Sequence, residues 1–354
     1  MSGIENMVRG SIAKIALYAS NREPCAIDLS DNTNQRGVPP SVRALVAQTN
    51  ANQLARYPSH YAPNLKRAIA DHLGIGPDEI VTGCGSDDVL DSAIRAFAQP
   101  GGVLAYPDPT FVMAPYFAQV NDLEPRPVPL LGAKDGWDVD AEALLAVRAA
   151  ITYVCSPNNP TGTRASAGAL DRILSEAAGV VLLDEAYIDY CDGSLVQRAK
   201  SAGRLLVVRT FSKAYGLAGA RVGYAVGAPE LVAAVEKSRG PYKVTALAEQ
   251  ATVAAMEKDR VWVDQGVRDV LAARERFVAF LESRKMAPLP SAANFVLVPV
   301  KDAAGLAKTL RQRGVAVRAF SGLTGIGDAL RISIAPWEIM EPALPFFEEV
   351  LPCA

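Results

Sequence analysis

Short runs of consecutive hydrophobic residues recur along the first two thirds of the chain, and polar or turn residues follow each run. The runs lie at 79–81, 102–106, 150–154, 180–183 and 205–208. Because their hydrophobicity is continuous rather than alternating, they are typical of strands buried on both faces of a parallel sheet. In such sheets, ligands bind beyond the carboxyl ends of the strands. We therefore predict an α/β fold with a mostly parallel sheet sandwiched by helices, and a site built from several loops.

The last third of the chain has a different pattern. Residues 248–280 have the spacing of a long helix, with a break near Trp262 or Gly266. Strands are predicted around a helix at about 302–313, and they lie at 294–298, 314–318 and 329–334. This pattern indicates a smaller α+β domain.

Length and composition limit the classes of protein that the chain can belong to. Its 354 residues are 50% hydrophobic and 21% charged, which suits a globular protein of two domains. We expect a large domain at 40–245 and a small domain formed by 1–39 and 246–354. The net charge is −2 and no basic block is present, so neither nucleic acid nor a membrane surface is an expected partner. No apolar stretch approaches the ~20 residues of a membrane span, and no signal-peptide run opens the chain.

The cysteines and histidines exclude several kinds of catalytic site. The five cysteines are scattered without a Cys-x-x-Cys pair, and this odd number indicates reduced thiols in a cytoplasmic protein. The two histidines, His60 and His72, lie far from any cysteine in the sequence. We therefore expect no metal site, and no Ser-His or Cys-His nucleophile pair. A small metabolite is the expected ligand.

A glycine-containing segment, Gly83-Cys84-Gly85-Ser86-Asp87, lies between a predicted strand and a predicted helix. Glycines permit a tight turn, and the free N–H groups at a helix start attract phosphate. A dinucleotide-binding motif would need glycine at position 88, where this chain has Asp88, so a nicotinamide dehydrogenase is not favoured. The alternative is that Ser86 or Asp87 only caps the helix.

Two further segments place polar side chains after predicted strands. Asp184 follows four apolar residues, and a carboxylate buried there needs a partner. It either caps a helix, forms a buried salt bridge or holds a cationic ligand. Asn158 and Asn159 lie between prolines in the turn sequence SPNNPTG, where they either shape the turn or present an amide to a ligand.

Lys213 lies just after the strand predicted at 205–208. Thr210, Ser212 and Arg221 are near it in the sequence, and each can donate a hydrogen bond to a phosphate. Partial burial would lower the pKa of the lysine and free its amine to attack a carbonyl group. A solvated surface lysine is the alternative for this segment taken alone.

Taken together, these segments resemble the fold-type I pyridoxal-phosphate aminotransferases, specifically the histidinol-phosphate aminotransferase branch. The matching segments appear in the family's order and cover nearly the whole chain. They are RYPSHYAPNLKRAIA (56–70), GCGSDD (83–88), YPDPTF (106–111), SPNNPTG (156–162), DEAY (184–187), TFSKAYGLAGARVGY (210–224), ANF (293–295), and VRAF with LRISI (317–334).

The resemblance implies that pyridoxal 5′-phosphate is the cofactor. It implies that Lys213 forms the Schiff base and moves the proton, while Asp184 pairs with the pyridine nitrogen and favours the protonated, electron-withdrawing ring. Asn159 and Tyr187 would form hydrogen bonds with the ring hydroxyl. Phe111 would stack on the ring.

The resemblance also implies how the phosphate of the cofactor is held. Tyr57 matches a tyrosine that reaches this phosphate from the other subunit, so the working unit is expected to be a homodimer. The remaining phosphate-binding residues would be Ser86, Asp87, Thr210, Ser212 and Arg221.

Substrate contacts are implied for residues at both ends of the chain. Arg331 matches the arginine that binds the carboxylate of the amino acid, and Arg318 matches a position that this branch uses for the substrate's phosphate; a surface arginine is the alternative for Arg318. Tyr18 matches a tyrosine that contacts the substrate, although Leu17 replaces the usual proline. Asn32 lies in a segment, Asp31-Asn32-Thr33-Asn34-Gln35, that departs from the family's Asn-Glu-Asn-Pro pattern.

The predicted reaction is the transamination of histidinol phosphate with 2-oxoglutarate in histidine biosynthesis, by a ping-pong mechanism. Two alternatives remain open within the same family of folds. One is an aromatic amino acid aminotransferase, for which Arg318 would have no phosphate to bind. The other is a lyase similar to threonine-phosphate decarboxylase, because the sequence does not fix which substrate bond stands perpendicular to the cofactor ring.

Overall fold

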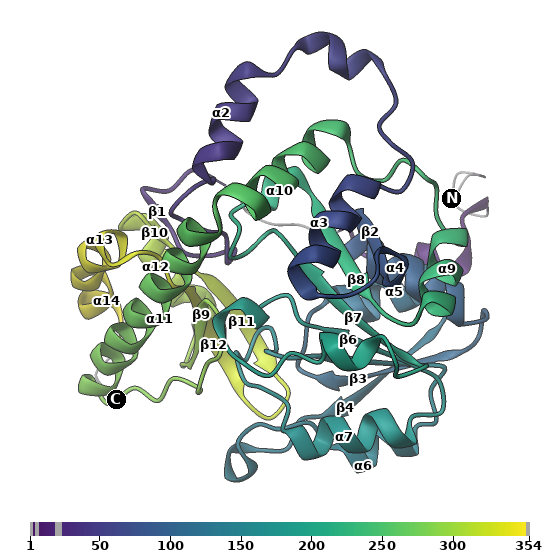
Figure 1. The fold of residues 1–354 in the computed structure, drawn as a ribbon. Coiled ribbons are helices and arrows are strands. Elements are labelled where there is room, and N and C mark those ends of the chain that lie inside the picture. Colours follow the sequence, from purple (N-terminus) through teal and green to yellow (C-terminus); the bar gives the residue numbers. More distant parts are fainter. Residues whose placement is uncertain (1–2, 4–6, 18–22, 352–354) are drawn as a thin grey trace.

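A seven-stranded sheet forms the centre of the computed structural model, which describes residues 3, 7–17 and 23–351 (Figure 1). The strands lie in the order β2 (Ile80–Cys84), β8 (Val222–Val226), β7 (Leu205–Thr210), β6 (Val180–Asp184), β5 (Ile151–Cys155), β3 (Val103–Asp108) and β4 (Glu124–Pro129). Strand β8 is antiparallel to both of its neighbours, and the other pairs are parallel. The predicted α/β fold with a mostly parallel sheet is confirmed.

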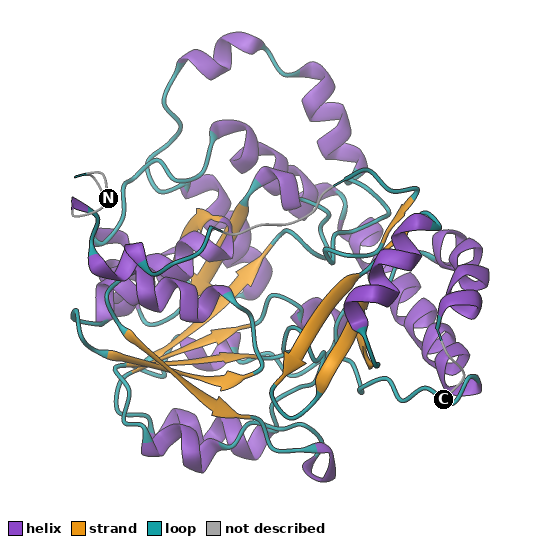
Figure 2. Ribbon diagram, turned by 180° about the vertical axis from the view of Figure 1, so that it is seen from behind, coloured by secondary structure: helices purple, strands orange, loops and turns teal. Residues whose placement is uncertain are grey.

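Helices cover both faces of this sheet (Figure 2). Alternate strand residues point to opposite faces, so Leu182 and Leu183 of β6 belong to different clusters. The cluster that contains Leu182 includes residues of α4 (Gly85–Phe97), α5 (Met113–Val120) and α9 (Pro229–Lys237). The cluster that contains Leu183 includes residues of α3 (Pro63–Leu73), α6 (Ala141–Ala146), α7 (Ala167–Glu176), α8 (Val196–Ala199) and α10 (Ala246–Lys258).

Strands β4 and β8 were not among the predicted elements. Strand β4 reads EPRPVP, and its prolines lack the N–H groups that a central strand uses. These prolines are tolerated because β4 lies at the edge of the sheet and pairs only with β3. Strand β8 begins inside the segment 210–224, which was recognised by its motif rather than by a hydrophobic pattern.

A second, antiparallel sheet consists of β11 (Arg318–Leu323), β12 (Gly327–Ser333) and β9 (Phe295–Pro299). Helices α11 (Arg260–Ser283) and α12 (Ala303–Gln312) pack on this sheet, and α13 (Trp337–Met340) and α14 (Leu344–Val350) pack on those helices. Strand β1 (Ile27–Asp28) pairs in parallel with β10 (Val315–Ala316) and so joins the N-terminal segment to this part of the chain. The domain boundaries near residues 40 and 245 stay a prediction.

The predicted break in the long helix is misplaced. Helix α10 ends at Lys258 and α11 begins at Arg260, so the break falls at Asp259 rather than near Trp262 or Gly266. The buried carboxylate of Asp259 accepts a hydrogen bond of 2.9 Å from the backbone N–H of Ser41, at the start of α2 (Pro40–Gln48). That hydrogen bond joins the break to a distant segment of the chain.

The N-terminal part contributes the short helix α1 (Gly10–Ala13), which packs against α5. Of the helices in the described part of the chain, none combines the length and the hydrophobicity that crossing a bilayer requires.

Candidate active site

A cavity of about 570 Å³ lies at the edge of the large sheet where β5, β6 and β7 end. Ten of the eleven residues that the sequence proposes for the cofactor line it. They are Ser86, Asp87, Phe111, Asn159, Asp184, Tyr187, Thr210, Ser212, Lys213 and Arg221. The carboxyl ends of neighbouring parallel strands meet at one edge, which explains why residues so distant in sequence share a cavity.

Asp184 is the last residue of β6 and lies at the base of the cavity. Its carboxylate accepts hydrogen bonds from the Tyr153 hydroxyl at 2.8 Å and from the backbone N–H of Ala186 at 3.0 Å. Burial raises the pKa of Asp184 to about 6, and these two hydrogen bonds oppose that rise. The group is therefore an anion near neutral pH, and it can hold a protonated ring nitrogen.

Lys213 lies in the loop after β7, and its amine faces the same cavity. Burial lowers the pKa of Lys213 to about 8, and the nearby guanidinium of Arg331 acts in the same direction. Asp31 opposes the shift. The amine nitrogen lies 5.6 Å from the centre of the Tyr187 ring. A large share of this amine is neutral near pH 8, which is the form that attacks a carbonyl carbon.

Hydroxyl, guanidinium and helix N–H groups gather at one end of the cavity. Ser86 and Asp87 lie in the first turn of α4, whose free N–H groups attract anions. The hydroxyl of Thr210 donates to that of Ser212 at 2.8 Å, and Arg221 forms a salt bridge of 3.2 Å with Asp87. Burial raises the pKa of Asp87, while Arg221 and Lys213 lower it. These donors make this end of the cavity suitable for a phosphate.

Two glycines permit close packing at this end of the cavity. A Cβ atom on Gly85, which has a φ of +80°, would lie 2.5 Å from Nη2 of Arg221. A Cβ on Gly223 would lie 2.2 Å from the backbone nitrogen of Ser86. A side chain at Gly85 would therefore displace Arg221, and one at Gly223 would displace the start of α4.

Tyr187 and Asn159 occupy the side of the cavity next to Arg331. The Tyr187 hydroxyl accepts a hydrogen bond of 3.1 Å from the Asn32 amide, and burial raises its pKa to about 12. Asn159 accepts a hydrogen bond of 2.6 Å from the Arg331 guanidinium. Asn32 also accepts a hydrogen bond of 2.9 Å from Ser333, so its amide is fixed in orientation.

A second cavity of about 440 Å³ continues from the first. The two share residues that include Phe111, Asn159, Tyr187 and Lys213. Residues predicted to bind substrate line the second cavity, namely Arg318, Arg331 and Asn32. Apart from Tyr18 and Tyr57, the cofactor and substrate residues proposed from the sequence thus line these two adjoining cavities.

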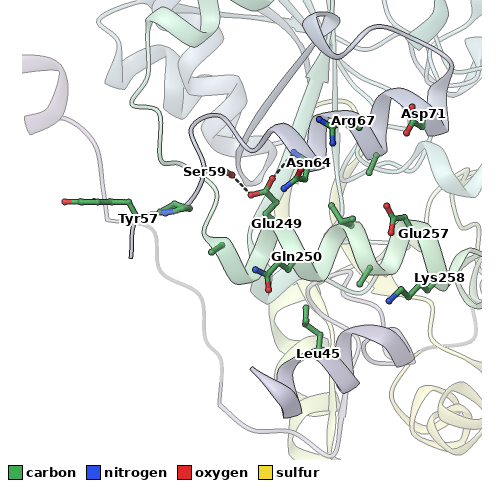
Figure 3. Close-up of a pocket in the computed structure, with 15 residues that line it drawn as sticks. Leu45, Tyr57, Ser59, Asn64, Arg67, Asp71, Glu249, Gln250, Glu257 and Lys258 are labelled. Atoms are coloured by element: carbon green, nitrogen blue, oxygen red, sulfur yellow. Dashed lines mark hydrogen bonds between the residues drawn. The ribbon is translucent and has the colours of Figure 1, made fainter. Parts of the chain in front are cut away.

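Two predicted residues are not placed at this site. Tyr18 lies outside the described residues. Tyr57 lines neither cavity; it is 83% exposed and stacks on Tyr242 with ring centres 5.0 Å apart. It borders a separate cavity of about 630 Å³ among α2, α3 and α10, and its ring points away from the other labelled residues of that cavity (Figure 3). Within one chain, Tyr57 does not reach the site.

The sequence did not identify several residues of the site. Tyr153 looked like an ordinary residue of a buried strand, although it donates to Asp184. Asp31 and Cys155 line the first cavity, and Phe320 lines the second. The position of Tyr153, two residues before the end of a strand that precedes a polar turn, is the signal that could have indicated it.

The residues present fit pyridoxal 5′-phosphate. The hydroxyl, guanidinium and helix N–H donors at one end of the cavity suit its phosphate. At the base, the Asp184 carboxylate suits its ring nitrogen, and the Lys213 amine suits its aldehyde. The predicted cofactor agrees with the donor set.

Proteins of similar sequence and structure are aminotransferases. The histidinol-phosphate aminotransferase of Thermoanaerobacter pseudethanolicus is 31% identical over 355 residues, which covers 98% of this chain and 99% of that protein. The aromatic amino acid aminotransferase of Corynebacterium efficiens is 34% identical over 323 residues, or 89% of this chain and 92% of that protein. The crystal structure of histidinol-phosphate aminotransferase from Sinorhizobium meliloti in complex with pyridoxal-5′-phosphate has a TM-score of 0.85 and 25% identity, over 97% of both chains.

The family model described as aminotransferase class I and II matches residues 25–341. Aminotransferases of this class depend on pyridoxal 5′-phosphate, so the predicted cofactor and the predicted transaminase class are confirmed. The match spans both sheets and every described residue that lines the two cavities. The chain therefore belongs to the class I and II aminotransferase family.

Proposed function

We propose that this protein transfers the amino group of histidinol phosphate to 2-oxoglutarate, as a step of histidine biosynthesis in the cytoplasm. Relatives with that name, similar over almost their whole length, support the substrate. Four cysteines among the described residues form no disulfide, which is typical of a reducing compartment and supports the proposed cytoplasmic location.

The observation that carries the proposal is the pairing of two arginines. Arg318 of β11 and Arg331 of β12 are directly opposite each other in the antiparallel ladder, and both line the second cavity. Like charges in directly opposed positions repel each other and destabilise a sheet. An anion between them would relieve that repulsion, and a phosphate can accept hydrogen bonds from both guanidinium groups. A substrate with a phosphate suits this arrangement, and the carboxylates of 2-oxoglutarate suit it as the second substrate.

In the proposed reaction, the cofactor supplies an aldehyde and an electron-withdrawing ring. Lys213 Nζ accepts the proton from the carbon that carries the substrate's amino group, and its lowered pKa makes the neutral base available. Asp184 would keep a positive charge on the ring nitrogen of the bound cofactor, and Tyr187 and Asn159 would orient its ring hydroxyl. Phe111 would hold the plane of the ring.

The phosphate of the cofactor would be held at the first turn of α4. We assign this role to the backbone N–H groups of Ser86 and Asp87, to the hydroxyl groups of Thr210 and Ser212, and to Arg221. Asp87 is the present partner of Arg221, and an incoming phosphate would compete with it.

The proposed working unit is a homodimer in which Tyr57 reaches the cofactor phosphate of the partner subunit. Tyr57 lies just after the 3₁₀ helix η2 (Ala51–Ala55), in a segment that projects from the body of the protein (Figure 1). Mixed dimers test this arrangement. A subunit with Tyr57→Phe and a subunit with Lys213→Ala each lack one group, but their mixture forms one complete site. At a cofactor concentration that leaves the Tyr57→Phe variant poorly saturated, mixing should raise the activity above that of either variant alone; no gain on mixing would contradict sharing.

Arg318→Ala tests the substrate, with Arg318→Lys as the matched control that retains the charge. The Ala variant should lose at least about tenfold in kcat/KM for histidinol phosphate, the scale of one lost charged hydrogen bond, and little for an aromatic amino acid. Equal losses for both substrates would favour an aromatic amino acid aminotransferase, the alternative that the Corynebacterium efficiens relative supports. Release of carbon dioxide from threonine phosphate, without oxo-acid formation, would contradict both.

A further inference from the structure

We propose that Tyr153 is a positioning residue that keeps the Asp184 carboxylate ionised and correctly oriented for the ring nitrogen of the cofactor. The inference rests on the role proposed above for Asp184. It adds a residue that does not line the cavity and that would act only through Asp184.

The register of two strands brings the hydroxyl to the carboxylate. Strands β5 and β6 are parallel neighbours in which Cys155 is opposite Asp184. Tyr153, two residues earlier on β5, projects from the same face of the sheet as Cys155. Its hydroxyl donates to Oδ2 of Asp184 at 2.8 Å, a normal length for a hydrogen bond to a carboxylate.

Burial makes this hydrogen bond important. Tyr153 is 1% exposed and Asp184 is 2% exposed. The ring of Tyr153 belongs to the cluster of Leu182, Leu206 and Val208, where water cannot replace a lost donor. The other carboxylate oxygen accepts from the N–H of Ala186. One donor therefore holds each oxygen, which fixes the plane of the carboxylate and leaves further acceptor capacity for a donor in the cavity.

The charges around Asp184 explain why a donor is needed. Burial is the largest cause that raises its pKa, and Asp87 of α4 adds to the rise. Tyr153 provides the strongest opposing effect, followed by the Ala186 N–H and then by Lys213. Burial and Asp184 also raise the pKa of Tyr153, so the phenol stays protonated and remains a donor.

Two other titratable groups face the carboxylate, and neither supplies a charge near neutral pH. Burial and Asp184 raise the pKa of the Cys155 thiol on β5. Burial raises the pKa of Tyr187 to about 12. Both groups therefore stay neutral, and the Cys155 thiol donates to the carbonyl oxygen of Pro157 instead. In the described part of the chain, Tyr153 supplies the side-chain hydrogen bond to Asp184.

The test measures the affinity of the apoenzyme for pyridoxal 5′-phosphate between about pH 5 and pH 9. Because the folded-state pKa of Asp184 is raised to about 6, its contribution to binding should be present above that pH and lost as the pH falls through it. Tyr153→Phe should move the midpoint of the pH dependence upward by about one pH unit. Below the wild-type midpoint, the affinity of the variant for the cofactor should be about tenfold lower than that of the wild type. Tyr153 with a fluorinated ring, a stronger donor of the same size, should move the midpoint downward.

Two controls separate this effect from packing and from the cofactor's own titration. Tyr106→Phe removes a hydroxyl from the same cluster, but Asp108 rather than Asp184 influences that phenol, so the midpoint should not move. Asp184→Asn gives the background from the cofactor's phosphate, which titrates near pH 6. In that background, Tyr153→Phe should have no further effect.

The outcomes distinguish the role inferred for Tyr153 from the role proposed for Asp184. An unchanged midpoint in Tyr153→Phe, or an equal loss from that change in the Asp184→Asn background, would overturn the role of Tyr153. Wild-type affinity and pH dependence in Asp184→Asn would instead overturn the proposed role of Asp184 itself. If Tyr153→Phe fails to fold, the direction of the shift in the fluorinated protein decides the question.

Discussion

The Lys213 amine is expected to be reactive near neutral pH even before cofactor binds. Its pKa is lowered from 10.5 to about 8, chiefly by burial and next by Arg331. At pH 8, about half of such amines are neutral, against about 0.3% of amines with the ordinary pKa, which is a ratio of about 150.

Substitutions near Lys213 should shift this pKa in opposite directions. Arg331→Gln removes a positive charge, so the pKa should rise toward 10.5 but not reach it, because the larger effect of burial remains. Arg331→Lys keeps a positive charge and is the matched control. Asp31→Asn removes the carboxylate that raises the pKa, so the pKa should fall.

The assay follows modification of apoenzyme lysines by fluorodinitrobenzene as a function of pH. Mass spectrometry of the Lys213 peptide gives the rate, and the exposed Lys308 serves as an internal reference. We expect the Lys213 rate to reach half its maximum near pH 8 in the wild type. A midpoint near 10.5 would refute the argument from burial. Equal midpoints for Arg331→Gln and Arg331→Lys would refute the argument from charge.

Three further substitutions have expected outcomes. Arg209→Met leaves the buried Glu185 carboxylate without the guanidinium that lies 3.0 Å away, so the free energy of unfolding in urea should fall by about 3–5 kcal/mol. Adding Glu185→Gln should recover much of the loss, and no recovery would contradict this reason. Gly223→Ala brings a Cβ to 2.2 Å from the Ser86 nitrogen, so melting temperature and cofactor affinity measured by dialysis should both fall; unchanged affinity would contradict the fit of the phosphate end. Glu249→Ala removes a carboxylate that accepts hydrogen bonds from two N–H groups at the start of α3. The free energy of unfolding, measured in urea, should therefore fall by about 1–3 kcal/mol.

The sequence located the site because its chemistry follows buried strands. A continuous hydrophobic run ends at Asp184, and another precedes Lys213, so both were assigned to the same edge of a parallel sheet. Strand order was not needed for that step, because all parallel strands end at one edge. The resemblance then supplied the cofactor, which hydrophobic patterns do not identify.

Contacts that depend on strand order were beyond the sequence. Tyr153 reaches Asp184 only because β5 lies beside β6 with Cys155 opposite Asp184. Neither fact follows from local pattern. The helix break at Asp259 likewise depends on Ser41, which is more than two hundred positions away. Tyr57 is a third case, because its predicted partner lies in another copy of the chain.

The direction of β8 explains how Arg221 reaches the site. Strands β2 and β7 end at the site, and β8 lies between them in the opposite direction, so its first residue, Val222, lies at that same edge. Arg221 immediately precedes it, and a β-bridge joins Val222 to Gly85 at the start of α4. A parallel β8 of five residues would place Arg221 about 17 Å away, at the opposite edge.

The backbone of Arg221 accepts strain at this position. Its φ is +53°, a left-handed conformation that costs a non-glycine residue about 1–2 kcal/mol. That conformation lets the guanidinium pass over Gly85, where a Cβ would lie 2.5 Å from it, and approach Asp87 at 3.2 Å. The strained residue lies where the phosphate of the cofactor is proposed to bind, and a dianion there would replace the Asp87 carboxylate as the partner of Arg221. The one antiparallel strand of the large sheet thus has a chemical reason: it brings a cation to an edge where the parallel strands bring an acid and an amine.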